Sequence, residues 1–275
     1  MNRIATTALA LALIAGAAAV ALAADDFTVD QIVDNALRVS YYQGATGRAD
    51  VKMTITDSQE RTRERELTIL RRDDVPEDQP DEDDLWLGDQ KFYVYFHRPA
   101  DVRKMAFLVH KHINGEDDRK LYLPALDLAK PIASSEERTS FAGSHFFYED
   151  VSGRNKDEDT HELVETTDNY YVLKNTPKNP DAVEFSFYKM WIHKKTFLVI
   201  KTEYYDKNDE KYREYQALKF DSVQDYSVIT KARMSDTRIG GHTEVEYSDV
   251  RFNIELPDDV FTERYLRRAP IKYLR

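Results

Sequence analysis

The chain has 275 residues, a formal net charge of -11 at pH 7 and no cysteine. The negative charge argues against nucleic-acid binding, which needs a basic surface for the phosphates, and the lack of cysteine excludes disulfides and a lipidated N-terminal cysteine. The 17 tyrosines and 13 phenylalanines favour a protein with many half-exposed strands over a helical bundle.

Residues 1–23 have the pattern of a signal peptide for export. A short basic start is followed by an apolar run at Ala8–Ala19 and by Ala21-Leu22-Ala23, which fits the small-x-small rule of signal peptidase. The alternative is a membrane anchor, but a spanning helix needs about 20 apolar residues with suitable flanks, and two aspartates follow directly. We therefore expect cleavage after Ala23 and a soluble periplasmic protein.

Residues 24–275 are expected to form a single domain, because no Gly/Ser/Pro-rich linker or internal repeat divides them. A helix should begin after Thr28, which is placed as N-cap with Gln31 three residues further on. The apolar residues that follow lie on one face of this helix as far as Tyr41, and Gly44 should end it.

From Gly47 onward, apolar and polar residues alternate with a period of two, which is the pattern of half-buried antiparallel strands. Strands are predicted at 49–55, 61–72, 92–97, 105–112, 162–164, 170–173, 183–187, 196–205, 212–221, 226–234, 243–247 and 250–254. The strand at 105–112 has apolar residues on both faces near its start, so we expect it to be covered on both sides. A change of parity predicts a β-bulge near Ser248 and Asp249, and Pro257 should open a short helix.

Two charged stretches need an interpretation. The arginines between 61 and 72, including Arg65 and Arg71, are read as the solvated face of an antiparallel strand in preference to a binding surface. Residues 73–84 contain eight carboxylates and no basic residue, which predicts a self-repelling loop. A calcium site there is less favoured, because the order of an EF-hand loop is missing.

The sequence offers little for catalysis or metal binding. Ser144 and His145 are the residue types of nucleophilic catalysis, but adjacent residues seldom point the same way, and their surroundings are not a G-x-S-x-G elbow. His110 and His112 would share one face of a strand and could bind zinc with His97. Without a clear further ligand, a polar sheet face is the preferred interpretation, and we expect no enzyme, no metal and no cofactor.

The most distinctive stretch is residues 117–151, which combine a short strand, a proline corner at Pro124, a polar loop and an aromatic cluster beside Gly143. This stretch resembles the LolA-like family of periplasmic outer-membrane lipoprotein-sorting proteins, especially a branch with the pattern YLP followed by F-x-G-S-D-F-x-Y-E-D. The matching residues are Tyr122, Leu123, Pro124, Ile132, Phe141, Gly143, Ser144, Phe146, Tyr148, Glu149 and Asp150. Further matches at 99–102, 106–108, 191–192, 203–206, 261–264 and 266 extend the resemblance over nearly all of the mature chain. The chain departs from the pattern at Lys104, Lys120, Pro131 and His145.

The resemblance implies a mainly β fold with some α: an incompletely closed antiparallel β-barrel of roughly ten strands, covered by the N-terminal helix on its concave side and by short helices. It also implies a carrier that holds lipoprotein acyl chains or other envelope lipids in an apolar cavity, with transient membrane contact. A packed core without a cavity is the alternative. The alternation of apolar residues predicts the cavity wall at Phe92, Val94, Phe96, Phe107, Phe185 and Phe187.

A second hypothesis belongs to another class of protein. The chain would then be an accessory subunit without carrier activity, docking on an inner-membrane lipid exporter of the RND type. Its contact would be the acidic stretch 73–84 or the C-terminal tail from Arg264 to Arg275, which is basic and contains no acidic residue.

Overall fold

The computed structural model describes residues 27–76 and 87–275. The predicted cleavage site at Ala23 and most of the acidic stretch 73–84 lie outside these residues. Within them, one antiparallel sheet of 13 strands has the order β6-β5-β4-β3-β2-β1-β13-β12-β11-β10-β9-β8-β7. Its strands are β1 (Thr46–Thr56), β2 (Thr62–Asp73), β3 (Gln90–Arg98), β4 (Ala106–Lys111), β5 (Asp118–Leu123), β6 (Leu128–Ile132), β7 (Asp159–Thr166), β8 (Tyr170–Pro177), β9 (Phe187–His193), β10 (Val199–Tyr205), β11 (Lys211–Val223), β12 (Tyr226–Asp236) and β13 (His242–Phe252).

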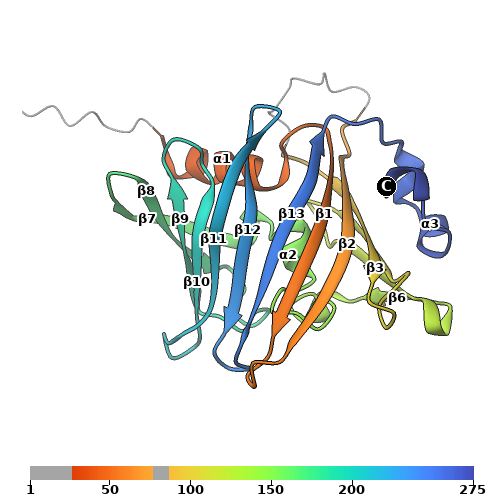
Figure 1. Ribbon diagram of the computed structural model, residues 1–275. Coiled ribbons are helices and arrows are strands. Elements are labelled where there is room, and N and C mark those ends of the chain that lie inside the picture. Colours follow the sequence, from red (N-terminus) through yellow and green to blue (C-terminus); the bar gives the residue numbers. More distant parts are fainter. Residues whose placement is uncertain (1–26, 77–86) are drawn as a thin grey trace, which may run out of the picture.

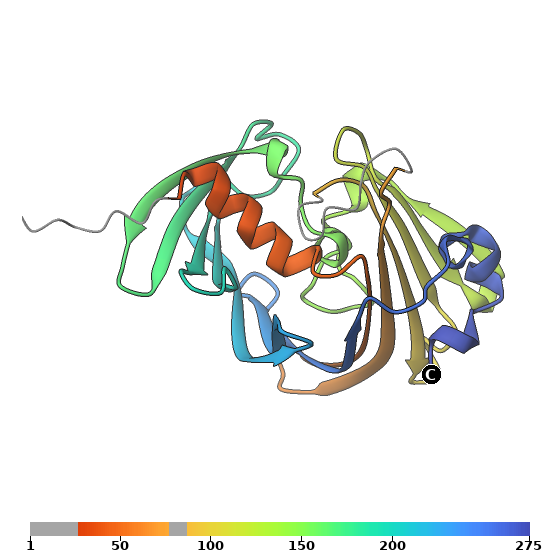
Figure 2. The same ribbon diagram turned by 90° about the horizontal axis from the view of Figure 1, so that it is seen from above.

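The sheet is strongly curved and does not close. Each strand pairs with its neighbour in sequence, except that β13 returns to pair with β1 and no pairing joins β6 to β7 in the described chain. Figure 1 shows the strands from the side, and Figure 2 shows from above how they enclose a concave space. The incompletely closed antiparallel barrel predicted from the sequence is therefore confirmed, with 13 strands in place of roughly ten.

Helices cover both sides of the sheet. They are α1 (Val29–Tyr41), α2 (Glu149–Ser152), α3 (Glu263–Arg267) and the short 3-10 helices η1 (Pro124–Leu126), η2 (Ser134–Glu136), η3 (Lys156–Glu158), η4 (Asp258–Phe261) and η5 (Ile271–Tyr273). None of the helices in the described residues is long and apolar enough to cross a membrane.

Helix α1 lies on the concave side of the sheet, as predicted (Figure 2). Its start is fixed by a capping box, because the Thr28 hydroxyl accepts a hydrogen bond from the Gln31 amide at 3.3 Å and the Gln31 side chain accepts one from the Thr28 amide at 2.8 Å. The buried face of the helix, with Ile32 and Ala36, packs on Leu173 of β8 and its neighbours in β9. Burial of this apolar face, more than helix propensity, holds the helix in place.

The C-terminal segment covers the convex side of β2–β5. Leu256, Phe261 and Leu266 pack there against the outer face of β4, which carries Ala106 and Leu108. The inner-face residues of the same strand belong to a second buried cluster. The prediction that this strand is covered on both sides is confirmed.

A β-bulge interrupts the pairing of the two central strands. Arg48 pairs with Arg251, but Asp50 pairs with Ser248, and Asp249 has a left-handed φ of 46°. The bulge lies where the change of parity predicted it, and bulges of this kind increase the local twist of a strand. It is one cause of the curvature that makes the concave side.

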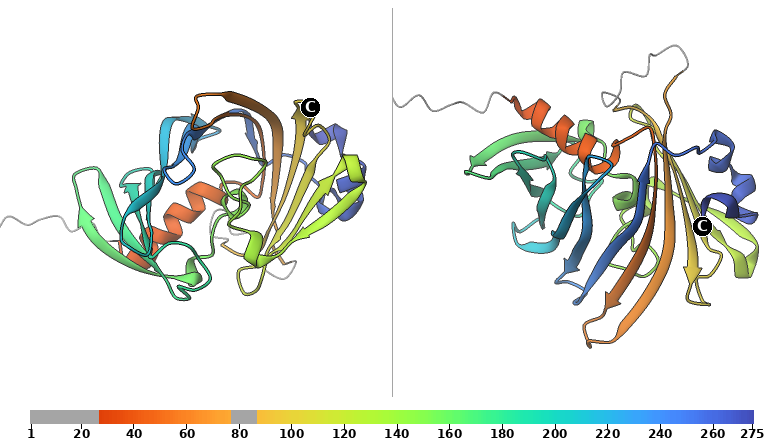
Figure 3. Two further views of the ribbon diagram at one scale, coloured as in Figure 1. Left: turned by 90° about the horizontal axis from the view of Figure 1, so that it is seen from below. Right: turned by 45° about the horizontal axis from the view of Figure 1, so that its top comes forward.

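The segment between β6 and β7, residues 133–158, folds back into the concave side and is called the inner loop below. It carries α2 and the aromatic cluster of the distinctive stretch (Figures 2 and 3). The ring of Phe141 lies 5.6 Å from the rings of Phe96 and Phe107, and Tyr148 lies 5.2 Å from Phe107. The aromatic cluster therefore fills the concave side in front of β3 and β4.

Candidate functional site

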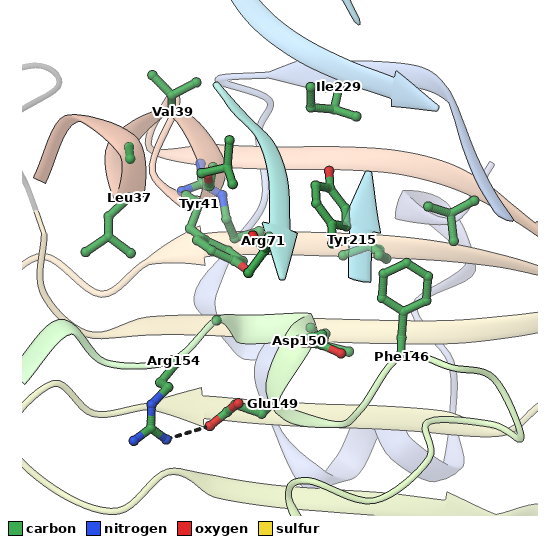
Figure 4. Close-up of a pocket in the computed structure, with 18 of the residues that line it drawn as sticks. Leu37, Val39, Tyr41, Arg71, Phe146, Glu149, Asp150, Arg154, Tyr215 and Ile229 are labelled. Atoms are coloured by element: carbon green, nitrogen blue, oxygen red, sulfur yellow. Dashed lines mark hydrogen bonds and ion pairs between the residues drawn. The ribbon is translucent and has the colours of Figure 1, made fainter. Parts of the chain in front are cut away.

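A cavity of about 420 Å³ lies on the concave side between α1, the inner loop and the inner face of the sheet. Figure 4 shows side chains from these elements extending into the same space. Its wall is mainly apolar and includes Val33, Leu37, Met53, Leu67, Ile69, Phe92, Phe146, Met190, Ile229, Val245 and Phe252. The volume falls within the range of about 300–1,000 Å³ that is typical of small-molecule sites.

The end of α1 over this cavity is fastened to the sheet by Arg71. Its guanidinium group donates to the carbonyl oxygens of Tyr41 at 2.7 Å and Gln43 at 2.8 Å, and to Asp73 at 2.8 Å. Gln90 adds a hydrogen bond to the Tyr41 carbonyl at 2.9 Å. Carbonyl groups at the end of a helix lack partners within the helix and carry partial negative charge, so a buried arginine stabilises them.

The expectation that the arginines of β2 form a solvated face was wrong for two of them. Arg65 and Arg71 are buried, with 6% and 8% of their surface exposed. Both belong to the face of β2 that also carries Leu67 and Ile69 of the cavity wall. Arg65 forms an ion pair with Asp101 at 3.2 Å, so these arginines fix local structure at the concave side.

The inner loop is held by buried ion pairs. Glu149 of α2 is 4% exposed and forms ion pairs with Arg138 and, at 3.1 Å, with Arg154. Arg138 has a further carboxylate, Glu184 at 2.8 Å, and Arg154 has two, Glu158 at 2.7 Å and Asp159 at 2.9 Å. Burial alone would raise the pKa of Glu149, but the two guanidinium groups outweigh burial and hold the pKa below its ordinary value.

The next residue, Asp150, anchors the loop to the opposite part of the sheet. Its carboxylate accepts hydrogen bonds from the Phe147 amide at 2.6 Å and from the fully buried Arg213 of β11. The Arg213 guanidinium also lies 3.9 Å from the ring centre of Phe147. The Tyr-Glu-Asp end of the distinctive stretch thus fixes the position of the cavity wall that the inner loop provides.

Of the predicted wall residues on β3 and β4, only Phe92 contacts the cavity among the described residues. Val94, Phe96 and Phe107 are fully buried on the same inner face, but the inner loop covers them. The alternation correctly placed these residues on one face, whereas the covering loop comes from a distant part of the sequence. A role of Phe92 in contacting a ligand stays a prediction.

The two predicted wall residues near β9 lie elsewhere. The predicted strand at 183–187 does not form, because β9 begins only at Phe187. Phe185 is buried beside the Arg138 guanidinium, 4.8 Å from it. Phe187 lies on the face opposite to the cavity-lining Tyr188 and stacks on Tyr205 at 4.5 Å.

The residues considered for catalysis have structural contacts. The Ser144 hydroxyl accepts a hydrogen bond from the Phe146 amide at 3.1 Å within the inner loop. The two ring nitrogens of His145 lie 2.9 Å from the Thr243 hydroxyl and 3.0 Å from the Gly240 carbonyl. The two side chains therefore contact different parts of the chain.

The three histidines considered for zinc also have separate partners. His97 contacts Thr68 at 2.9 Å, His110 contacts the carbonyl of Phe261 at 2.7 Å, and His112 contacts Asp89 at 2.8 Å. In residues 27–76 and 87–275, no group of three or more potential metal ligands occurs.

An open antiparallel half-barrel with a helix on its concave side defines a LolA-like protein, and comparison with solved structures confirms this class. A protein of the DUF1329 family from Desulfovibrio piger is 25% identical and superposes with a TM-score of 0.75 over 86% of this chain and 98% of that one. An outer membrane lipoprotein-sorting protein domain from Vibrio parahaemolyticus is 26% identical, with a TM-score of 0.74 over 86% and 97%. A LolA superfamily protein from Nitrosomonas europaea, at 19% identity and a TM-score of 0.65 over 87% and 99%, shares the fold.

A protein family whose description is "Uncharacterized protein" has a model that matches residues 88–268, and the chain belongs to this family. No curated protein sequence matches the chain.

Proposed function

We propose that the protein is a periplasmic carrier that binds lipoprotein acyl chains or other envelope lipids in its cavity and moves them toward the outer membrane. The observation that carries this proposal is the cavity of about 420 Å³ with its mainly apolar wall. The similarity to a lipoprotein-sorting domain from Vibrio parahaemolyticus supports the same class of ligand.

The chemistry of such a carrier is simple. Each CH₂ group moved from water into an apolar site contributes about 0.8 kcal/mol, so an acyl chain binds without any charged contact. The carrier needs no catalytic residue, because release requires only an acceptor that binds the lipid more tightly.

The direct test is whether the protein isolated from its own periplasm carries lipid. Native mass spectrometry and lipid extraction should show a co-purifying lipid, and the delipidated protein should take up a fluorescent fatty acid. If neither is observed, the concave side is only a structural core and the carrier function is refuted.

Two phenylalanines offer a matched pair of variants. Phe146 is half-buried and lines the cavity, whereas Phe187 is half-buried on the opposite side of the sheet (Figure 4 shows Phe146). Phe146→Asp should weaken uptake at least about 30-fold, because an unpaired polar group facing an acyl chain costs about 2 kcal/mol or more. Phe187→Asp should leave uptake unchanged, and equal losses in both variants would place the binding site elsewhere.

The accessory-subunit hypothesis has some support from the C-terminal segment. Leu266 and Leu274 anchor this segment on the convex side of the sheet, while Arg264 and Arg268 are exposed. Exposed arginines on the side away from the cavity are available for a partner such as an RND-type exporter. Pull-downs should lose that partner when these two arginines are neutralised, and unchanged recovery would exclude this surface as the contact.

A further inference from the structure

The cavity wall contains a group of tyrosines without hydrogen-bond partners. Four tyrosines line it from different elements: Tyr41 at the end of α1, Tyr204 on β10, Tyr215 on β11 and Tyr247 on β13. None of the four hydroxyls has a hydrogen-bond partner among the described residues. A fifth tyrosine of the same wall, Tyr188, does have one, since it donates to Asp159 at 2.8 Å. We call the four unpartnered residues the tyrosine group.

Three members of the tyrosine group, Tyr41, Tyr204 and Tyr247, lie within electrostatic reach of Asp150. Tyr215 lies within electrostatic reach of Tyr41 and Tyr247. Burial raises the pKa of Tyr41 well above its ordinary value, and the negative charge of Asp150 and the three other tyrosines raise it further. Burial and Asp150 together raise the pKa of Tyr247 to about 12. Figure 4 shows Tyr41, Tyr215 and Asp150 extending into the same space. All four hydroxyls therefore stay protonated at neutral pH and can donate hydrogen bonds.

Asp150 adds an acceptor to this part of the wall. Its hydrogen bonds to the Phe147 amide and to Arg213 both use Oδ2. Its other oxygen, Oδ1, has no hydrogen-bond partner among the described residues. Asp150 lines the cavity, and 16% of its side chain is exposed. This part of the mainly apolar wall is thus polar, with hydroxyl donors from several elements and a carboxylate acceptor.

This polar region constrains what can fill the cavity. Water can satisfy the hydroxyls while the cavity is empty of lipid. A pure hydrocarbon would displace that water and leave the hydroxyls and the carboxylate oxygen without partners, which is unfavourable. A hydroxyl group on the ligand can accept from a tyrosine and donate to Asp150 at the same time. An ionised carboxylate or a fully ionised phosphate on the ligand has no hydrogen to donate to Oδ1 of Asp150, whose charge Arg213 already pairs, so that oxygen would stay without a partner.

Building on the proposed carrier function, we infer that the cavity takes a lipid with an uncharged hydroxyl group, which the tyrosine group and Asp150 bind while the wall holds the hydrocarbon part. No local pattern in the sequence indicates this region, because its residues lie far apart in the chain and meet only through the curvature of the sheet.

The test compares two ligands that differ only at the polar end. 1-Dodecanol carries a hydroxyl where tridecane carries a methyl group, and both are titrated against a neutral fluorescent probe, N-phenyl-1-naphthylamine, bound to the purified protein. The variant Tyr215→Phe/Tyr247→Phe removes two hydroxyls and keeps the rings. Tyr205→Phe is the matched control, because its hydroxyl donates to Glu203 at 2.8 Å on the other face of the sheet.

The double variant should bind dodecanol about tenfold more weakly than the wild type, while its affinity for tridecane is unchanged or higher. The control should show neither change. An equal loss for both ligands, or no loss for dodecanol, would overturn the inference and leave the carrier function standing. Dodecanoate is titrated as a third ligand. A larger loss for dodecanoate than for dodecanol would also overturn the inference, since the region would then be an anion site. If no ligand displaces the probe from wild-type protein, the carrier function itself fails.

Discussion

The buried ion pairs of the inner loop lead to a quantitative prediction about Glu149. The variant Glu149→Gln keeps the size of the side chain and removes its negative charge. Arg138 would then keep Glu184 at 2.8 Å, and Arg154 would keep Glu158 at 2.7 Å and Asp159 at 2.9 Å. The two buried guanidinium groups would lose the carboxylate that they share.

The expected loss follows from what buried pairs cost when one partner is removed. That cost is about 3–5 kcal/mol for an isolated pair. Because both arginines retain a carboxylate, we expect a somewhat smaller loss of roughly 2–4 kcal/mol in the free energy of unfolding. Such a loss is a large share of the about 5–15 kcal/mol that stabilises a typical domain.

Urea unfolding followed by far-ultraviolet circular dichroism measures this loss, with the transition midpoint falling and the slope unchanged. Glu244→Gln is the control. This glutamate pairs at 2.9 Å with Lys231 on the outer face, where half-exposed pairs contribute about 0–1 kcal/mol. If the two variants lose the same stability, the ion pairs of the inner loop are not what fixes it, and the reasoning is refuted.

Three further predictions concern other parts of the chain. Gly241→Ala should lower the free energy of unfolding in urea by more than about 2 kcal/mol, because φ is +82° and a Cβ would lie 2.2 Å from the Thr56 carbonyl oxygen. Gly143→Ala is the control: φ is +76° but a Cβ would meet open space, so the loss should be about 1–2 kcal/mol. Burial would raise the pKa of Glu184, but its hydrogen bonds to the Arg138 guanidinium lower this pKa to about 2. The stability that Glu184 contributes is present above about pH 4.5 and should be lost as the pH falls toward 2. Glu184→Gln should flatten that loss in an acid titration. Sequencing of the mature N-terminus should begin at Ala24, and retention of residues 1–23 would contradict the export prediction.

Much of the fold could be predicted from the sequence because its signals are local. The capping box of Thr28 and Gln31 placed the start of α1, and period-two alternation placed most of the strands. The parity change at Ser248 and Asp249 placed the bulge. Each of these signals spans only a few residues, so it does not depend on what packs around it.

The site could not be predicted in the same way. Alternation showed that Phe96 and Phe107 share a face, but whether that face meets empty space or a covering segment depends on residues far away in the sequence. Arg71 looks like any charged residue of a solvated strand, and its burial is explained only by the carbonyl groups at the end of α1 and by its buried partner Asp73. Phe187 was predicted to face the cavity, but its neighbour Tyr188 faces it instead. The predicted strand at 183–187 does not form, and β9 begins at Phe187.

The distinctive stretch that marks the family has a structural role that bears on the position of the cavity. Its aromatic residues Phe141 and Tyr148 fill the concave side in front of β3 and β4, and its carboxylates Glu149 and Asp150 tie α2 to buried arginines. The space that remains lies between the inner loop, α1 and the strands from β2 through β13 to β9. A ligand is therefore expected to contact residues outside the family pattern for the most part, such as Tyr215 and Tyr247, and these positions are where members of the family can differ in the lipid they bind.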